Sequence, residues 1–267
     1  MHALVDSHCH LDAAEFDTDR EDIVARAHKA GVGALVLPAV MRDNFEAVLD
    51  LHRRYPECLP ALGLHPMFVD SAAPDDLKLL DQMLGRPEVV AVGEIGLDFF
   101  VPDHDRDKQL VFYTEQLKLA GKHGLPVLLH VRKSQDDILK YLRRHRVRGG
   151  IAHAFNGSRQ QAEAFIDLGF KLGFGGAMTW PGALRIRELA ATLPLTSIVL
   201  ETDAPDIPPV WLGRGGRNSP EQLPAIARVL AELRGKTVAE IVDTTTQNVL
   251  DVLPKMHQLC TPPQVLL

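Results

Sequence analysis

Short apolar runs alternate with amphipathic segments eight times along the chain. Each run is rich in Val, Leu, Ile or Ala and mostly lacks the polar–apolar alternation of a half-exposed strand. Continuous apolar runs of this length are typical of strands buried on both faces of a parallel sheet. We therefore predict eight strands, within residues 4–10, 34–40, 59–65, 89–97, 126–131, 150–155, 170–175 and 197–203.

The segments between these runs have helical patterns with recognisable starts. Four of them begin with a capping box, in which two side chains satisfy free backbone N–H groups: Thr18-x-x-Glu21, Ser158-x-x-Gln161, Ser219-x-x-Gln222 and Thr237-x-x-Glu240. One apolar stripe with helical spacing consists of Leu223, Ile226, Ala227 and Leu230. We expect these segments to be helices that pack against the strands.

Strand–helix alternation with short connections implies parallel strands joined by right-handed crossovers. Eight such units predict an α/β fold, namely a single-domain (β/α)8 TIM barrel over residues 1–260, with residues 261–267 as a C-terminal tail. A Rossmann fold is disfavoured because no glycine fingerprint follows the first strand. The longest irregular stretch, residues 204–218, follows the last strand, and a loop of that length is usually functional.

Composition narrows the range of partners. The 267 residues are 46% hydrophobic and 24% charged, which is typical of a globular protein. With 29 basic and 35 acidic residues, the formal net charge of −6 excludes a sequence-independent nucleic-acid coat, so a phosphate-bearing substrate requires a local site. The basic stretch of residues 143–148 should lie at the bottom of the barrel, as structural surface.

The cysteines and the start of the chain bear on the compartment. Cys9, Cys58 and Cys260 lie far apart, which argues against a disulfide framework and favours a reducing compartment. The first strand begins too early to leave room for a signal peptide, and no apolar run approaches the length of a membrane span. We expect a cytoplasmic protein, monomeric and without membrane contact.

Six side chains that can bind metals fall in or at the ends of five predicted strands: His8, His10, Glu94, His130, His153 and Asp203. The active site of a (β/α)8 barrel forms at the C-terminal ends of its strands. Each residue has a structural alternative, such as a salt bridge or a hydrogen-bonded core histidine, but independent explanations would not place all six at one end. His8 and His10, two apart in a strand, project to the same side, which leaves Cys9 as a core residue.

A catalytic zinc needs three protein ligands and a water molecule, which is fewer than this set offers. We therefore expect two divalent metal ions, Zn, Mg or Mn, roughly 3.5–4 Å apart and bridged by a carboxylate. Glu94, on a middle strand, is the candidate bridge.

The motifs in combination resemble the TatD-related metal-dependent deoxyribonucleases, a branch of the amidohydrolase superfamily. The resemblance extends from the first strand to about Pro220 and rests on five segments: His8-Cys9-His10-Leu11, Gly93-Glu94-Ile95-Gly96-Leu97-Asp98, the strands of His130 and His153, and Glu201-Thr202-Asp203-Ala204-Pro205. It implies a barrel whose divalent metal centre hydrolyses phosphodiesters, with ligands at His8, His10, Glu94, His130, His153 and Asp203.

The chain departs from that family at positions that bear on the substrate. Phe99 stands where the family often has an aromatic hydroxyl, and Asp206-Ile207 stands where many members have Tyr-Leu. The segment His153-Ala154-Phe155-Asn156-Gly157 replaces the usual His-Cys-Phe-Ser-Gly. The candidate ligands are unaffected by these departures.

We expect metal-assisted hydrolysis of a phosphodiester, in which Asp203 and Glu94 are catalytic and Asp203 is the general base for a metal-activated water. We expect the substrate to be a nucleic acid, most simply DNA, that is bound by local contacts only. Its phosphate groups could be contacted by His65, Arg132, Arg214 and Arg217. Trp211 could stack on a base or pack within its loop.

Three alternatives stay open at this point. A D-aminoacyl-tRNA deacylase would use the same metal centre on an ester. An amidohydrolase that cleaves a C–N bond shares the H-x-H pattern, but many such enzymes bridge their metals with a carboxylated lysine where this chain has Glu94. A non-catalytic scaffold or binding barrel would be expected to lack some of the ligands.

Overall fold

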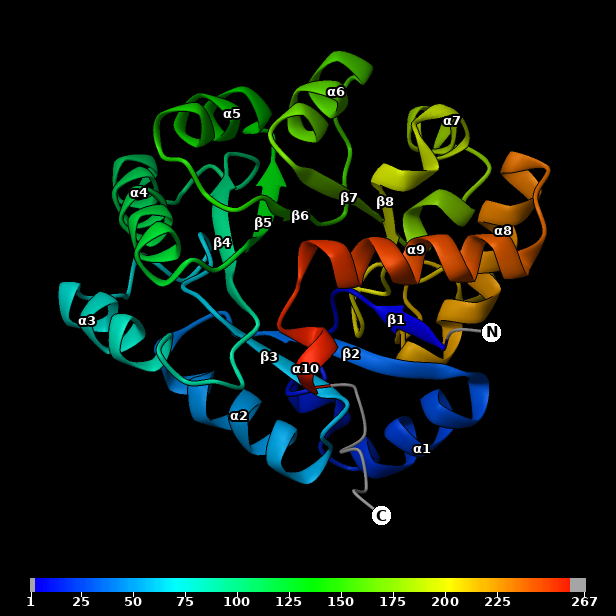
Figure 1. Cartoon of the computed structure of the whole chain (residues 1–267), viewed down its shortest axis with the longest axis horizontal. Coiled ribbons are helices and arrows are strands. Elements are labelled where there is room, and N and C mark those ends of the chain that lie inside the picture. Colours follow the sequence, from blue (N-terminus) through cyan, green and yellow to red (C-terminus); the bar gives the residue numbers. More distant parts are fainter. Residues whose placement is uncertain (1–2, 260–267) are drawn as a thin grey trace.

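Eight parallel strands form a barrel that is surrounded by helices in the computed structural model, which describes residues 3–259 (Figure 1). Each strand pairs with the next in chain order, from β1 to β8. The strands are β1 Leu4–Asp6, β2 Val32–Pro38, β3 Cys58–Leu62, β4 Ala91–Asp98, β5 Val127–Arg132, β6 Gly150–Ala152, β7 Phe170–Phe174 and β8 Ile198–Leu200. The predicted single-domain (β/α)8 TIM barrel is therefore confirmed. Cys260 and the predicted tail at residues 261–267 lie outside the described residues.

The barrel is drawn together between β8 and β1 by backbone hydrogen bonds just beyond both strands. Ser7 N–H donates to the carbonyl of Leu200 (3.0 Å), and Asp203 N–H donates to the carbonyl of His8 (2.9 Å). His10 N–H donates to the carbonyl of Ala204 at 2.8 Å. The segments that follow the first and last strands are thus fixed side by side.

Eight helices follow the strands and cover the outside of the barrel: α1 Arg20–Ala30, α2 Phe45–Arg54, α3 Pro74–Met83, α4 Arg106–His123, α5 Gln135–Arg144, α6 Arg159–Asp167, α7 Leu184–Thr192 and α8 Leu223–Arg234. Two more, α9 Val238–Val252 and α10 Met256–Leu259, complete the described residues. The predicted apolar stripe of α8 is fully buried. No helix among residues 3–259 is long and apolar enough to cross a membrane.

Two layers of apolar side chains make up the core. The larger lies between the strands and the surrounding helices, and the smaller fills the barrel interior with residues such as Val36, Leu59 and Ile151. Val249 and Met256, from α9 and α10, belong to the interior cluster. These two helices lie across the end of the barrel where the strands begin (Figure 1), so the other end is left for a site.

Two of the four predicted capping boxes are confirmed, at Ser158 of α6 and Thr237 of α9. The box at Thr18 is wrong because Asp19 is the N-cap of α1, and the carboxylate of Asp19 binds Arg217 instead of a backbone N–H. The box at Ser219 is also wrong. Pro220 begins a separate 3₁₀ turn there, and α8 begins only at Leu223.

Several predicted strands continue too far toward their C-terminal ends. β1, β6 and β8 are three residues long, because the backbone beyond them bonds to neighbouring loops instead of extending the sheet. His8, His10, His153 and Asp203 therefore lie just after strands, whereas Glu94 and His130 lie within β4 and β5. All six side chains still lie in or just after the C-terminal ends of strands. The shorter strands therefore do not change the end of the barrel at which the site is expected.

Candidate metal centre

The six predicted ligands converge at the C-terminal end of the barrel, and His65, which follows β3, joins them. Three groups of donor atoms each lie within 4.8 Å of one another: His8, Glu94 and His153; His8, His10 and Asp203; and His65, Glu94 and His130. Cys9, between two of these histidines, is buried among apolar side chains, as predicted.

Glu94 occupies the middle of the cluster, and its two carboxylate oxygens face different histidines. Oε1 lies 3.3 Å from His65 Nε2, 2.9 Å from His130 Nδ1 and 3.2 Å from His153 Nε2. Oε2 lies 3.1 Å from His8 Nε2 and 3.6 Å from His10 Nε2. This is the arrangement expected of a carboxylate shared between two sets of donors.

Asp203 completes the set around Oε2 of Glu94. Its Oδ1 lies 3.6 Å from His8 Nε2 and 3.7 Å from His10 Nε2. The backbone φ of Asp203 is 58°, in the left-handed region that L-residues rarely adopt. Such backbone conformations persist where the surrounding structure enforces them, often at functional sites. Here the hydrogen bond from Asp203 N–H to the His8 carbonyl holds the turn.

The donor chemistry fits a divalent cation. Nε2 of His8 and Nε2 of His10 lie 3.3 Å apart, and both face the same carboxylates. Imidazole nitrogens combined with carboxylate oxygens suit zinc and related transition metals. A buried carboxylate is costly unless it is paired or coordinates a metal, so a cation among these atoms would satisfy both groups.

The protonation states agree in part with this chemistry. Burial, together with neighbouring His153, lowers the pKa of His8 to about 3, and burial lowers that of His65 to about 4, so both imidazoles are neutral. Metal ligation requires neutral imidazole. Burial opposes ionisation of Glu94, but the charge of nearby His153 and the hydrogen bond with His130 help to hold its pKa well below the usual range.

Two other groups have opposite shifts. Burial disfavours the charged form of His153, but Glu94 and Asp203 outweigh it and raise the pKa of His153 well above its usual value. Burial raises the pKa of Asp203 to about 6, against the lowering effect of His153. A carboxyl group with a pKa near neutrality can accept and release a proton at physiological pH.

Three further buried carboxylates orient the cluster, and the sequence did not single them out as site residues. Asp98 Oδ2 lies 3.0 Å from Nε2 of His130, which directs Nδ1 of that ring to Glu94. Asp6 accepts hydrogen bonds from Thr202 N–H (2.9 Å) and from His8 N–H (3.3 Å), so it joins the segments after β1 and β8. A carboxylate within an apolar strand was the available signal for these residues.

The third carboxylate, Glu201, supports the His153 segment. Its Oε1 accepts a hydrogen bond from Ala154 N–H (2.5 Å) and lies 3.7 Å from His153 Nδ1. Gly173 of β7 makes room for it, since a Cβ there would lie 2.2 Å from Glu201 Oε2. The Glu201 carboxylate can therefore occupy this position only because the neighbouring strand has a glycine there.

Two glutamines on one face of α4 secure the ends of β3 and β4. Gln116 accepts from Leu64 N–H (2.7 Å) and donates to the carbonyl of the same residue (3.1 Å). Gln109, seven residues earlier, binds the N–H and carbonyl of Asp98 in the same way. These side chains replace the missing sheet partners beside His65 and Asp98, and neither was predicted.

The predicted substrate contacts have different surroundings. Arg132, at the end of β5, is half exposed, with its guanidinium 3.8 Å from Asp98 Oδ2 and 3.9 Å from the centre of the Phe100 ring. Arg214 lies 5.3 Å from the centre of the Trp180 ring. Arg217 is not brought to the cluster, because both Asp19 carboxylate oxygens bind it, at 2.6 and 2.9 Å.

Trp211 and the basic stretch of residues 143–148 were also noted in the sequence. Trp211 is exposed and donates a hydrogen bond from Nε1 to Gln222 Oε1 at 2.8 Å. The basic stretch of residues 143–148 extends from the end of α5 to just before β6. It therefore lies at the end of the barrel opposite the donor cluster.

Comparison with known proteins agrees with this geometry. The model of the family described as "TatD related DNase" matches residues 5–254. The chain is 44% identical over 248 residues to "Uncharacterized metal-dependent hydrolase YjjV" of Escherichia coli K12, covering 92% of this chain and 95% of that protein. It is 34% identical to the human "Deoxyribonuclease TATDN3", covering 96% of each. The crystal structure of the E. coli K12 TatD homologue YjjV superposes with a TM-score of 0.90 at 43% identity, covering 94% of this chain and 98% of that one.

Proposed function

This chain belongs to the TatD-related DNase family of metal-dependent hydrolases, and we propose that it is a phosphodiesterase that cleaves DNA with two divalent cations. The observation that carries the proposal is the position of Glu94, whose carboxylate oxygens face two different sets of histidines. A carboxylate between two donor sets is the usual bridge of a two-metal hydrolytic site. The human relative is named a deoxyribonuclease, which supports DNA as the substrate.

Most of the seven donor side chains can be assigned to one of two cations. His8, His10 and Asp203 would hold one, and His65 and His130 the other, with Glu94 shared. His153 groups with His8 and Glu94, and it also lies 3.2 Å from the Glu94 oxygen that faces His65 and His130, so it stands between the two sets. In this division His65 is a ligand, whereas the sequence alone suggested a contact to phosphate. Divalent cations at such a site lower the pKa of bound water and neutralise charge on phosphoryl oxygens.

The protein's own residues supply the proton transfer and the orientation. Asp203 lies at the edge of the donor cluster, where it accepts the proton of the attacking water as general base. Its orientation is fixed by the hydrogen bond from its N–H to the His8 carbonyl. Arg132 and Arg214, both exposed and both in segments at the C-terminal ends of strands, would pair with substrate phosphates.

The test compares three substrates with purified protein: a 3′-labelled DNA oligonucleotide, a dihydropyrimidine and D-Tyr-tRNA. We expect hydrolysis of the oligonucleotide, its loss in EDTA and its recovery on adding Mn²⁺, Mg²⁺ or Zn²⁺. Hydrolysis of only the dihydropyrimidine or only D-Tyr-tRNA would assign the chain to a C–N-cleaving amidohydrolase or a deacylase. Metal-loaded protein that hydrolyses none of the three would contradict the proposal and favour a binding barrel.

The same assay with Asp203→Asn tests the general base. Removal of a positioned acid or base typically costs about 10²- to 10⁴-fold in rate. We expect a loss of that size in kcat, with the fold and most of the bound metal retained. Substantial hydrolysis by the purified variant would remove Asp203 from this role.

A further inference from the structure

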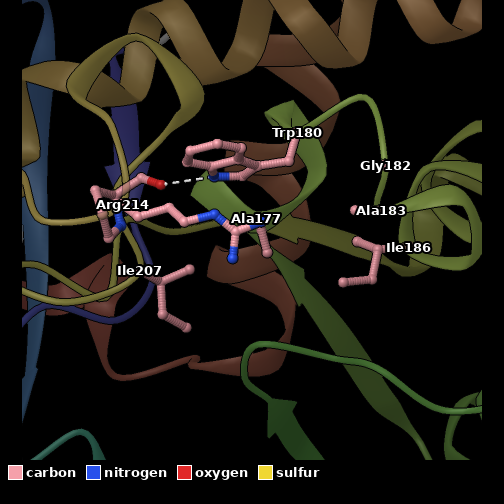
Figure 2. Close-up of a pocket in the computed structure, with 8 residues that line it drawn as sticks. Ala177, Trp180, Gly182, Ala183, Ile186, Ile207 and Arg214 are labelled. Atoms are coloured by element: carbon pink, nitrogen blue, oxygen red, sulfur yellow. Dashed lines mark hydrogen bonds between the residues drawn. The ribbon is translucent and has the colours of Figure 1, made fainter.

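A pocket of about 550 Å³ lies between the segments that follow β7 and β8 (Figure 2). Its walls include Ala177, Trp180 and Ile186 after β7, and Ile207 and Arg214 after β8. Both loops leave the C-terminal ends of their strands, so the pocket opens at the same end of the barrel as the donor cluster. Its volume is in the range that small-molecule sites occupy.

The position of the Trp180 indole is set by a hydrogen bond. Its Nε1–H donates to the carbonyl of Pro208 at 3.0 Å, which joins the two loops and leaves the indole along the pocket (Figure 2). Ile207 and Ile186 lie on opposite sides of the same space (Figure 2). A fixed aromatic face among apolar side chains is suited to stacking with a planar ring.

Arg214 adds a positive charge to this apolar pocket. Its guanidinium lies 5.3 Å from the centre of the Trp180 ring, and within residues 3–259 it has no carboxylate partner. Both Arg214 and Arg217 of this loop are exposed, but only Arg217 is bound by a carboxylate, that of Asp19. An unpaired guanidinium of this kind is available for a phosphate.

One wall of the pocket belongs to the chain segment that directly follows Asp203. Ile207 lies four residues after Asp203, and a turn shortens the distance, since Asp206 N–H donates to the carbonyl of Asp203 at 2.8 Å. Asn218 Nδ2 donates to the carbonyls of Thr202 (2.8 Å) and Ile207 (3.3 Å). Four extended residues span at most about 14 Å, so the pocket wall is within reach of a nucleotide bound at the cluster.

We propose that this pocket binds the base of the nucleotide next to the cleaved phosphodiester, with Trp180 stacking on the base and Arg214 pairing with an adjacent phosphate. The proposal rests on the proposed function, because it takes a nucleic acid as the substrate. Stacking requires a base that is free of its partner, so the site selects single-stranded or frayed ends. Because every base has a flat face, it recognises bases without discriminating strongly among them.

The chain contains two tryptophans, Trp180 and Trp211, which allows a binding test that does not depend on catalysis. In Trp211→Phe, Trp180 is the sole tryptophan, and we expect its fluorescence to be quenched by a short single-stranded oligonucleotide with phosphorothioate linkages. In the matched variant Trp180→Phe, the remaining Trp211 should keep its fluorescence on addition of the same oligonucleotide. Binding itself is followed in parallel by the anisotropy of a dye on the oligonucleotide.

A kinetic comparison tests how much stacking on Trp180 contributes to catalysis. Stacking on an aromatic side chain is worth about 1–3 kcal/mol, so Trp180→Ala should lower kcat/KM for an oligonucleotide by about 5- to 150-fold. Trp180→Phe, which keeps an aromatic ring, should lose much less, and Trp211→Ala should match the wild-type protein. On an oligonucleotide with an abasic residue at the adjoining position, Trp180→Ala and wild type should be equally slow.

The possible results separate the pocket from the hydrolytic activity. Quenching of Trp180, absent with the abasic oligonucleotide, supports the pocket even if no cleavage is detected. Anisotropy that shows binding while Trp180 fluorescence is unchanged overturns the pocket and leaves the nuclease proposal intact. Absence of binding to any oligonucleotide overturns the pocket as a nucleotide site. Equal losses for Trp180→Ala on both oligonucleotides also overturn it, because they indicate a structural role.

Discussion

At the scale of single residues, the centre is an assembly of buried charged and polar groups that would be unfavourable in isolation. Glu94, Asp98 and Glu201 are each almost completely buried. Their partners differ: Glu94 contacts histidines, and Asp98 contacts His130 and two backbone N–H groups. Glu201 accepts a hydrogen bond from Ala154 N–H at Oε1, whereas its buried Oε2 has no hydrogen-bond partner among residues 3–259. The last two hold ligand segments in place, whereas only Glu94 reaches both donor sets.

Glu94→Gln tests the bridging role of this carboxylate. An amide has one acceptor oxygen instead of two equivalent ones and carries no charge, so it cannot link two cations as the carboxylate does. We expect the metal content, measured by mass spectrometry after gel filtration, to fall from two ions per chain to one or fewer. Glu88→Gln, which changes a carboxylate paired with Arg86 away from the site, should leave the content unchanged. Two ions per chain in folded Glu94→Gln would contradict the bridge.

At the scale of elements, helices position the site through polar side chains that bind strand ends. Gln116 and Gln109 of α4 do this for β3 and β4. Asn248 of α9 donates to the carbonyls of Leu195 (2.8 Å), just before β8, and of Ile198 (2.7 Å), the first residue of β8. The strands are short, so few sheet hydrogen bonds fix their ends. Side-chain amides on the surrounding helices supply the missing bonds.

The start of α9 predicts a pH dependence of stability. Glu240 binds Thr237 N–H at 2.9 Å, and Lys236 lies 3.0 Å away. The backbone hydrogen bond, followed by the contact with Lys236, lowers the pKa of Glu240 from 4.5 to about 2. The folded state therefore favours the ionised form, so this contribution is complete above pH 4.5 and is lost as the pH falls toward 2.

Glu240→Gln isolates that contribution, because glutamine preserves the capping hydrogen bond and removes the titration. We expect the wild-type protein to have the higher free energy of unfolding above pH 4.5, with the difference shrinking as the pH falls toward 2. Urea unfolding of both proteins at a series of pH values measures it, and effects of the metal centre cancel in the difference. A difference that is constant with pH would contradict the assignment.

At the scale of the whole molecule, the two ends of the barrel have different tasks. α9 and α10 close the end where the strands begin with apolar side chains, whereas the opposite end gathers imidazoles and carboxylates from all around the ring. The net charge of −6 makes the exposed arginines at that end important for an anionic substrate. The monomeric state and the cytoplasmic location stay predictions.

Removal of the metal should destabilise the entire fold, because the ligands come from segments after or within β1, β3, β4, β5, β6 and β8. A ligand at 100 times its dissociation constant stabilises the native state by about 2.7 kcal/mol, which corresponds to roughly 5–10 °C in Tm for a domain of this size. We expect EDTA followed by buffer exchange to lower Tm by that amount, and Zn²⁺ or Mn²⁺ to restore it. The same treatment should shift Glu94→Gln much less. An unchanged Tm after verified metal removal would contradict this coupling.

The sequence alone determined the barrel and six members of the donor cluster. Unbroken apolar runs specify buried parallel strands locally, and a histidine or carboxylate at the end of such a run is conspicuous because burial disfavours it. The capping boxes at Ser158 and Thr237 were also predicted correctly, because a capping box involves residues only three positions apart. Patterns that a few neighbouring residues complete can be read without the fold.

Only the tertiary structure decided which groups meet across the ring. His65 faces Glu94 from the segment after β3, Arg217 is paired with Asp19 almost 200 residues away, and Trp180 meets Arg214 across two loops. Each of these contacts depends on the curvature of the closed barrel and on the course of its loops. Local sequence carries no record of that geometry, because the same side chains would fit equally well in an exposed turn.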